Sequence, residues 1–202
     1  AEGSVKGVHN VGDVMFDVTL LAREATGATT SIIDEIGLKP GPYAVATLHR
    51  AENTDNDMCL KRLLDYLRSE ASERQIVFPV HPRTRIAVSK AGLNFDGLIA
   101  CEPMGYLDMV RLLKGADLVY TDSGGVQKEA YFHRVPCVTL RDETEWVELV
   151  EAGFNRLLSP FVSDVLESFE QMQAVVIPKG GGLYGGGDAA KKILQAIIGE
   201  EC

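Results

Sequence analysis

The sequence predicts an α/β fold, a doubly wound parallel sheet of the Rossmann-like kind. Six short runs are largely apolar without alternation, which is typical of strands covered on both faces of a parallel sheet. Segments of 3.6-residue periodicity separate the runs, and right-handed crossovers through such helices leave successive strands parallel. The predicted strands are residues 43–48, 75–80, 97–101, 117–121, 136–140 and 155–158.

Apolar stripes predict the helices between these strands. The stripes are Leu60, Leu63, Leu64 and Leu67; Tyr106, Met109, Val110 and Leu113; and Val165, Phe169, Met172 and Val176. A separate helix is expected over residues 11–25, whose apolar members are Val14, Val18, Leu20 and Leu21. One or two further turns are expected over residues 29–37, and a last helix over 189–198.

Residues 179–188 contain six glycines. A stretch so poor in side chains predicts a flexible loop without packed structure. Such a loop is either a linker to the last helix or a segment that closes over a ligand.

Length and charge limit the class of protein. The 202 residues predict one domain, with 46% apolar and 24% charged residues, as in ordinary globular proteins. The formal net charge of −9 argues against binding to nucleic acids or anionic membranes, because both are polyanions. No apolar run approaches the roughly 18 residues of a membrane span, and no secretory signal opens the chain. We therefore expect a cytoplasmic protein.

The start of the chain and its cysteines bear on processing and redox chemistry. The chain opens on Ala1, which fits either loss of an initiator methionine or a chain cut from a longer one. The cysteines form no Cys-x-x-Cys pair and no Cys/His cluster, so the sequence indicates neither a zinc site nor a redox dithiol. We expect them to be reduced thiols. They are Cys59, Cys101, Cys137 and Cys202.

The predicted topology places the chemistry. Ligands bind beyond the carboxyl ends of parallel strands, where strand order reverses. With the common order 3-2-1-4-5-6, a crevice opens between the first and fourth strands. The loops that leave these two strands are rich in polar residues, over 49–53 and 122–125.

The loop after the fourth strand resembles an anion site. Ser123, Gly124 and Gly125 precede a helix, whose free N–H groups and dipole attract a phosphate. Glu129 lies one helical turn further on, within reach of a ribose diol. The alternative is that Ser123 only caps the helix and the glycines serve packing.

The loop after the first strand adds cations. His49 and Arg50 are positioned for a diphosphate, and Glu52 and Asn53 are expected to hold the loop by local hydrogen bonds. The neighbouring strand ends add His81, Arg83, Arg85 and Arg141. A cationic rim on an acidic protein predicts a small anionic ligand, a nucleotide or a sugar phosphate.

Other cofactors are disfavoured. The first strand is not followed by Gly-x-Gly-x-x-Gly, and there is no Gly-Lys-Ser/Thr loop, which argues against NAD and a Walker-type ATP site. The histidines show no metal-ligand spacing. His133, at the end of its helix, is expected to be a partner of the helix dipole or a surface residue.

Five segments carry a family resemblance. They are HNVGDVMFD (9–17), TLHRAENTD (47–55), PVHPRT (79–84), TDSGGVQKEA (121–130) and RDETEWVE (141–148). In this order and spacing they resemble the UDP-N-acetylglucosamine 2-epimerases over almost the whole chain.

The resemblance implies the C-terminal half of a GT-B-like two-domain enzyme. Residues 1–40 would connect to an N-terminal domain, 41–178 would form the UDP-binding domain, and 179–202 the glycine-rich loop and last helix. The full-length protein would be a homodimer that epimerises C2 of UDP-GlcNAc to UDP-ManNAc by eliminating and re-adding UDP, without a cofactor. The carboxylates that handle the C2 proton would belong to the N-terminal half, so this chain alone is expected to be inactive.

By the same resemblance, His49 would be catalytic, near the diphosphate. Ser123, Gly124 and Gly125 would bind the phosphates and Glu129 the ribose. Met104 and Met109 would lie on the uracil side. Arg50 and His81 match residues through which some bacterial members bind an activating second UDP-sugar, although a loop-anchoring role is equally consistent.

One departure concerns the sugar. Trp146 and Val147 stand where the bacterial GlcNAc enzymes commonly carry Arg and Pro. This variant is similar to relatives that act on UDP-diacetamido-uronic acids, which makes such a sugar an alternative substrate. A GT-B glycosyltransferase and a non-catalytic nucleotide-sugar binding module would also be consistent with these residues.

Overall fold

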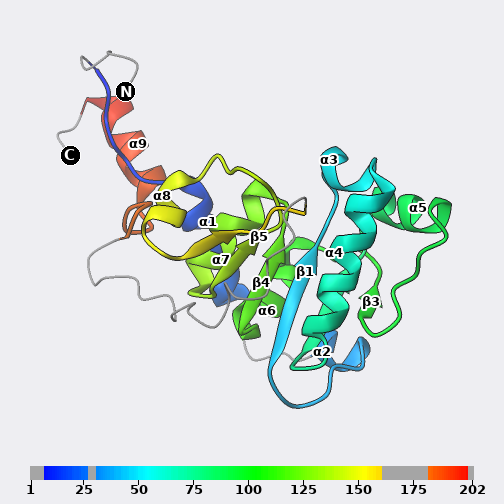
Figure 1. The fold of residues 1–202 in the computed structure, drawn as a ribbon. Coiled ribbons are helices and arrows are strands. Elements are labelled where there is room, and N and C mark those ends of the chain that lie inside the picture. Colours follow the sequence, from blue (N-terminus) through cyan, green and yellow to red (C-terminus); the bar gives the residue numbers. More distant parts are fainter. Residues whose placement is uncertain (1–6, 27–30, 161–181, 200–202) are drawn as a thin grey trace.

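A six-stranded parallel sheet forms the centre of the molecule in the computed structural model, which describes residues 7–26, 31–160 and 182–199 (Figure 1). The strands are β1 (Tyr43–Thr47), β2 (Gln75–Pro79), β3 (Ile99–Cys101), β4 (Leu118–Thr121), β5 (Cys137–Thr139) and β6 (Asn155–Leu157). Their order is β3-β2-β1-β4-β5-β6, and all neighbouring pairs are parallel. The predicted fold class and strand order are confirmed.

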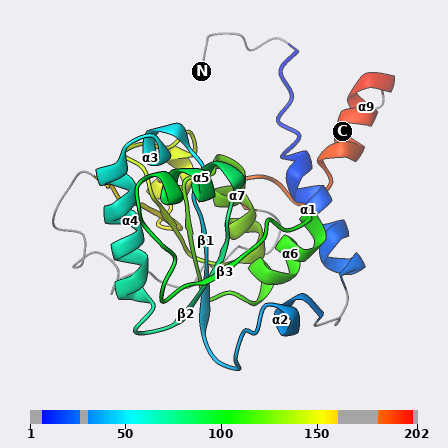
Figure 2. The ribbon, with the colours of Figure 1, turned by 90° about the vertical axis from the view of Figure 1, so that its right-hand side faces the viewer.

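Helices cover both faces of the sheet, with α4 on one side and α6 and α7 on the other (Figure 2). The helices are α1 (Val14–Ala25), α2 (Ser31–Glu35), α3 (Ala51–Thr54), α4 (Asp57–Glu70), α5 (Pro82–Lys90), α6 (Tyr106–Gly115), α7 (Gly124–His133), α8 (Val147–Glu151) and α9 (Ala189–Ile198). The predicted first and last helices are confirmed. The stripe predicted over residues 165–176 lies outside the described residues.

The core explains why the strand runs lack alternation. In β1, Ala44 and Ala46 pack toward α4, whereas Tyr43 and Val45 pack toward α6 and α7. Both faces of the strand are therefore buried, and both need apolar side chains. The four leucines of the α4 stripe are all buried. Tyr106 departs from its stripe, because it stands in the first turn of α6 and remains 42% exposed.

The glycine-rich segment is packed where the structure describes it. Tyr184 contacts aromatic rings of α7 and the Trp146 ring. Gly12 has φ +90°, and a Cβ there would lie 2.9 Å from the Tyr184 carbonyl oxygen. The expectation of an unpacked loop is wrong for residues 182–188, because glycines let two backbones approach closely. Residues 179–181 lie outside the described part.

The two ends of the described chain meet at α1. The Asp17 carboxylate accepts hydrogen bonds from the backbone N–H groups of Ala189 (3.1 Å) and Ala190 (2.7 Å), and so caps α9. From this cap α9 projects away from the body, beside the segment that precedes α1 (Figures 1 and 2).

Apolar side chains remain exposed on both of these helices, and we call them the terminal apolar surface. They are Val14, Val18 and Leu21 on α1, and Ile193, Leu194, Ile197 and Ile198 on α9.

Further expectations from the sequence concern cysteines, membranes and metals. Cys59, Cys101 and Cys137 are free thiols, and the first and last of them are buried; Cys202 lies outside the described residues. Among the described residues, no helix is long and apolar enough to cross a bilayer. That part of the chain also contains no group of three or more His, Cys, Asp or Glu side chains arranged to hold a metal ion.

Candidate functional site

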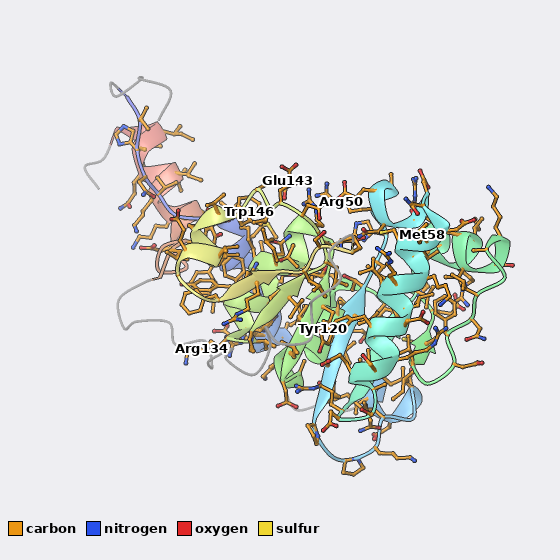
Figure 3. The ribbon with its side chains drawn as sticks, in the orientation of Figure 1. Arg50, Met58, Tyr120, Arg134, Glu143 and Trp146 are labelled. Carbon is orange, nitrogen blue, oxygen red and sulfur yellow. The ribbon has the colours of Figure 1, made fainter. Side chains whose placement is uncertain are left out.

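The predicted crevice lies at the carboxyl ends of β1 and β4. The Thr47 and Thr121 hydroxyl groups that end these strands are 2.6 Å apart, so the two loops start side by side. Figure 3 shows Arg50, Glu143 and Trp146 along this edge of the molecule, and Arg134 at the opposite end.

Asp122 organises the crevice. Its carboxylate is completely buried and accepts hydrogen bonds from the backbone N–H groups of His49 (2.9 Å) and Arg50 (2.8 Å). It also accepts one from the Asn53 side-chain amide (3.1 Å). Asp122 directly precedes Ser123, so one side chain fixes the loop after β1 against the loop after β4. The sequence pattern predicted no role for Asp122. Its position between a buried strand and the Ser-Gly-Gly turn is the feature that could have indicated one.

His49 is oriented by the same carboxylate. Its Nδ1 lies 3.3 Å from Asp122 Oδ1, and its side chain is 37% exposed. Because Nδ1 lies on the Asp122 side of the ring, Nε2 is the nitrogen further from this carboxylate. The predicted site residue therefore stands at the carboxyl end of β1, partly exposed and beside Asp122.

The polar side chains of α3 bind distant partners. Asn53 donates to Asp122 and to the Leu140 carbonyl oxygen (3.0 Å), while Glu52 accepts from Arg141 (2.8 Å). The expectation of local hydrogen bonds is wrong for Glu52, whereas Asn53 also has a local one, accepted from Cys59 Sγ (3.5 Å). Their distant partners follow β4 and β5, which no local pattern indicates.

The turn after β4 caps α7. Ser123 is the N-cap, and its Oγ accepts from the Val126 N–H at 3.5 Å, so the capping alternative describes the free chain. A Cβ on Gly124 would come 3.2 Å from the Trp146 indole nitrogen. A Cβ on Gly125 would meet only the Ser123 Oγ, at an ordinary 3.9 Å. Packing within the described chain thus explains the first glycine and does not require the second.

Glu129 lies one helical turn from Gly125, on the same face of α7. Burial raises the pKa of its carboxyl group to about 7. A half-buried carboxyl group with a pKa raised to near neutral pH, beside a partly exposed helix start, is typical of a functional position.

The arginines at the strand ends are paired with acids. The pairs are Arg50–Glu145 (3.2 Å), Arg83–Asp55 (2.6 Å), Arg85–Glu102 (2.8 Å), Arg141–Glu52 (2.8 Å) and Arg141–Glu145 (2.9 Å). The prediction of a cationic rim is therefore wrong in one respect, because the positive charges of these arginines are compensated by neighbouring acids. The neutralising acids lie up to 95 residues away in sequence. In the free chain, the backbone N–H groups and the helix dipole at the start of α7 remain to attract an anion at this edge.

A hollow of about 290 Å³ opens beside the crevice. Its lining is Glu52, Asn53, Arg141, Asp142, Glu143 and Pro160. Three carboxylates face one guanidinium group, so this hollow repels an anion. The Ser-Gly-Gly turn remains the better candidate for a phosphate.

Arg50 and His81 both have structural roles in the free chain. Arg50 pairs with Glu145, and His81 is the N-cap of α5, where its Nδ1 accepts from the Arg83 N–H (3.1 Å). The His81 ring lies 5.4 Å from the His49 ring, centroid to centroid. These direct contacts support the loop-anchoring interpretation. Binding of a second ligand through Arg50 and His81 stays a prediction.

Met104 and Met109 lie after β3 and in the first turn of α6. Both are half-buried against the core cluster that contains Val77 and Val119. Their position at the carboxyl end of the sheet agrees with the predicted uracil side, and the contact itself stays a prediction.

His133 does not fit its predicted role as a dipole partner or surface residue. It is buried, and within the described residues neither ring nitrogen has a hydrogen-bond partner. Burial, together with Arg23 and Lys114, lowers its pKa to about 4. The ring is therefore neutral at pH 7 and cannot act as a cation toward the helix end.

The fold and this crevice define a doubly wound α/β protein whose polar loops meet where the strand order reverses. The model of the UDP-N-acetylglucosamine 2-epimerase family matches residues 1–198, and the chain belongs to this family.

Relatives share its sequence over most of its length. It is 41% identical over 191 residues to UDP-2,3-diacetamido-2,3-dideoxy-D-glucuronate 2-epimerase of Pseudomonas aeruginosa, covering 94% of this chain and 52% of that protein. It is 41% identical over 202 residues to a UDP-N-acetylglucosamine 2-epimerase homolog of Methanococcus maripaludis, with coverages of 97% and 56%. The chain thus spans about half the length of the curated relatives it matches.

A solved structure shows the same fold. The UDP-GlcNAc 2-epimerase of Methanocaldococcus jannaschii, in complex with UDP-GlcNAc and UDP, superimposes with a TM-score of 0.79 at 32% identity. The match covers 93% of this chain and 54% of that one.

Proposed function

We propose that this chain is the UDP-binding half of a UDP-sugar 2-epimerase that interconverts UDP-GlcNAc and UDP-ManNAc. The observation that carries the proposal is the Ser123–Gly125 turn. It starts α7 at the crevice, and packing gives no reason for glycine at position 125. Close approach of a ligand to the backbone supplies that reason.

The diphosphate would bind at the start of α7. Since the nearby arginines are paired, the attraction comes from the backbone N–H groups of this turn and the helix dipole. The Ser123 hydroxyl group would turn from capping Val126 to donate to a phosphate oxygen. The ribose diol would donate to Glu129, one turn along the same face.

His49 would assist departure of UDP. With Nδ1 close to Asp122, Nε2 is the nitrogen left for a ligand, and when the ring carries both protons the Nε2–H group would donate to the leaving diphosphate and stabilise its developing charge. In this proposal the C2 proton is handled by carboxylates of the N-terminal half, so the 202-residue chain binds UDP without turning over the sugar.

The terminal apolar surface supports a partner domain. Leu194 is 58% and Ile197 75% exposed on the projecting helix α9, and apolar side chains so exposed are typical of an interface. Relatives of about twice the length have the additional chain to cover it. We include in the proposal the division into a connecting segment (1–40), a UDP-binding domain (41–178) and a C-terminal segment (179–202). A homodimeric, cytoplasmic full-length enzyme also belongs to it.

A second sugar should be assayed beside the first. The identity to the Pseudomonas protein, named as acting on UDP-2,3-diacetamido-2,3-dideoxy-D-glucuronate, equals the identity to the Methanococcus homolog. Together with Trp146, this favours testing both UDP-sugars.

The test of function is an epimerase assay on the full-length protein with each UDP-sugar and no acceptor. The 2-epimer should appear in solution, with UDP released during turnover, and His49→Ala should lower the rate by about a hundredfold or more. Product that appears only with an acceptor would indicate a glycosyltransferase. Binding of UDP-sugars without any product would indicate a binding module, and an unchanged rate in His49→Ala would contradict the role of His49.

A further inference from the structure

Trp146 contacts the turn that begins α7. Its indole N–H donates to the Gly124 carbonyl oxygen at 2.8 Å. The same nitrogen is the atom that a Cβ at position 124 would approach most closely. Trp146 is thus bonded to the middle of the Ser-Gly-Gly turn, from the loop that follows β5.

The indole is itself held in place from its other side. The Lys128 ammonium group lies 4.2 Å from the centroid of the Trp146 ring and 5.0 Å from that of Tyr184. Lys128 is buried and forms an ion pair with Asp13, the N-cap of α1. The cation–π contact of the buried Lys128 constrains the half-buried Trp146 ring. These contacts hold the ring in the orientation that directs its N–H to Gly124.

The hydrogen bond from Trp146 restricts the backbone at Gly124. A glycine has the widest choice of backbone conformations, so two adjacent glycines would leave the turn poorly defined. The bond from Trp146 removes that freedom at Gly124 while leaving the space beside Gly125 open.

We propose that Trp146 is a positioning residue of the phosphate-binding turn, which it holds ready for a diphosphate through the Gly124 carbonyl. This inference rests on the proposed function for its ligand. It also gives a role to tryptophan at position 146, where related enzymes commonly carry arginine: Trp146 would act on phosphate binding through Gly124. A turn fixed before binding costs less conformational entropy when the ligand arrives.

The test compares Trp146→Phe with Tyr184→Phe in the 202-residue chain. Phenylalanine keeps an aromatic ring for Lys128 and loses the N–H donor. Tyr184→Phe is the matched control, because it removes the hydroxyl group that donates to Glu148 (2.7 Å) in the same cluster without touching the turn. Trp146→Tyr serves as a second variant if the Phe variant does not fold.

Two readouts separate positioning from packing. UDP should bind the Trp146→Phe chain about fivefold more weakly, whereas uridine, which lacks phosphates, should bind within about twofold of the unchanged chain. Without ligand, the amide of Val126, which donates to the Ser123 hydroxyl oxygen, should exchange hydrogen faster in this variant only. The Tyr184→Phe control should change neither measurement.

The possible failures are distinguishable. Equal losses for UDP and uridine, or unchanged amide exchange, would overturn the role of Trp146 and leave UDP binding intact. If the unchanged chain binds no UDP, the proposed function fails. In that case, amide exchange in the Trp146→Phe chain still tests whether Trp146 positions the turn: faster exchange supports this role, and unchanged exchange contradicts it.

Discussion

The crevice and the terminal apolar surface differ in which groups they bury. The crevice buries a charged group, whereas the terminal apolar surface exposes apolar groups. In the crevice, the charged Asp122 is completely buried, and protein N–H groups satisfy it. On α9, the apolar Ile197 is 75% exposed. Burying a carboxylate is costly unless it is fully hydrogen-bonded, and exposing an isoleucine forgoes hydrophobic stabilisation. In the proposed function, the first surface receives a small polar ligand and the second a protein partner.

The largest effect should follow removal of the buried carboxylate. Asp122→Ala leaves the N–H groups of His49, Arg50 and Asn53 without their acceptor. We expect the free energy of unfolding to fall by about 3–5 kcal/mol in urea titrations followed by circular dichroism. Asp142→Ala, at an exposed carboxylate of the neighbouring hollow, should change it by no more than about 0.5 kcal/mol. Equal effects would show that Asp122 does not organise the crevice.

The next effect depends on pH. The pKa of Glu129 in the folded chain, about 7, exceeds its ordinary value of 4.5, so the folded state binds more protons between these pH values. The stability of the folded state therefore falls as the pH rises from 4.5 through 7, by up to about 3 kcal/mol at pH 8. Glu129→Gln should remove that fall, measured as unfolding free energies at pH 4.5 and 8. Parallel pH profiles for both proteins would contradict the burial of this group.

UDP affinity should depend on the ionisation of Glu129 in the opposite direction to stability. Ribose hydroxyl groups donate best to the ionised carboxylate, so UDP affinity should weaken as the pH falls below 7, by up to about tenfold per pH unit. Calorimetric titrations at about pH 6 and pH 8 measure this. The Glu129→Gln chain controls for titration of the UDP phosphate, and identical slopes in the two chains would exclude Glu129 from the ribose site.

An effect on stability smaller than that of Asp122→Ala is expected where the chain ends meet. Gly12→Ala places a Cβ against the Tyr184 carbonyl at a positive φ, and should cost about 2–3 kcal/mol. Gly7 also has a positive φ (+75°) but open space around it, so Gly7→Ala should cost only about 1 kcal/mol. Thermal unfolding of the two variants compares them directly. A Gly12→Ala variant as stable as Gly7→Ala would mean that the 182–188 turn does not pack against this segment.

The smallest effect belongs to the terminal apolar surface. The double variant Leu194→Ser, Ile197→Ser should change the unfolding free energy of this chain by no more than about 0.5 kcal/mol. Leu64→Ser, at a fully buried leucine of α4, should cost about 3 kcal/mol or more. A large loss in the double variant would show that α9 packs within the chain, leaving no surface for a partner.

The fold could be predicted well because its signals are local. Runs such as residues 75–80 and 136–140 are apolar without alternation because both strand faces are buried, and the switch-point rule then placed both polar loops in one crevice. Tyr106 was assigned to a buried stripe and is partly exposed, because the first turn of α6 lies at the end of the packed face.

The site was predicted in outline and missed in its contacts. The partners of Asp122 lie about 70 residues away, and Arg141 meets Glu52 89 residues away, so no spacing in the sequence indicates them. The packed glycine turn was missed because Gly12 and Gly185 explain each other only when the two ends of the chain are brought together.

Calorimetric titration of the 202-residue chain with UDP tests the central claim most directly. We predict one UDP bound per chain, weaker binding of UMP because a phosphate is lost, and no binding of NAD. We also expect Ser123→Ala to weaken UDP binding by about three- to tenfold through the lost hydroxyl donor. No UDP binding, or equal heats with UDP, UMP and NAD, would contradict a UDP site at the crevice.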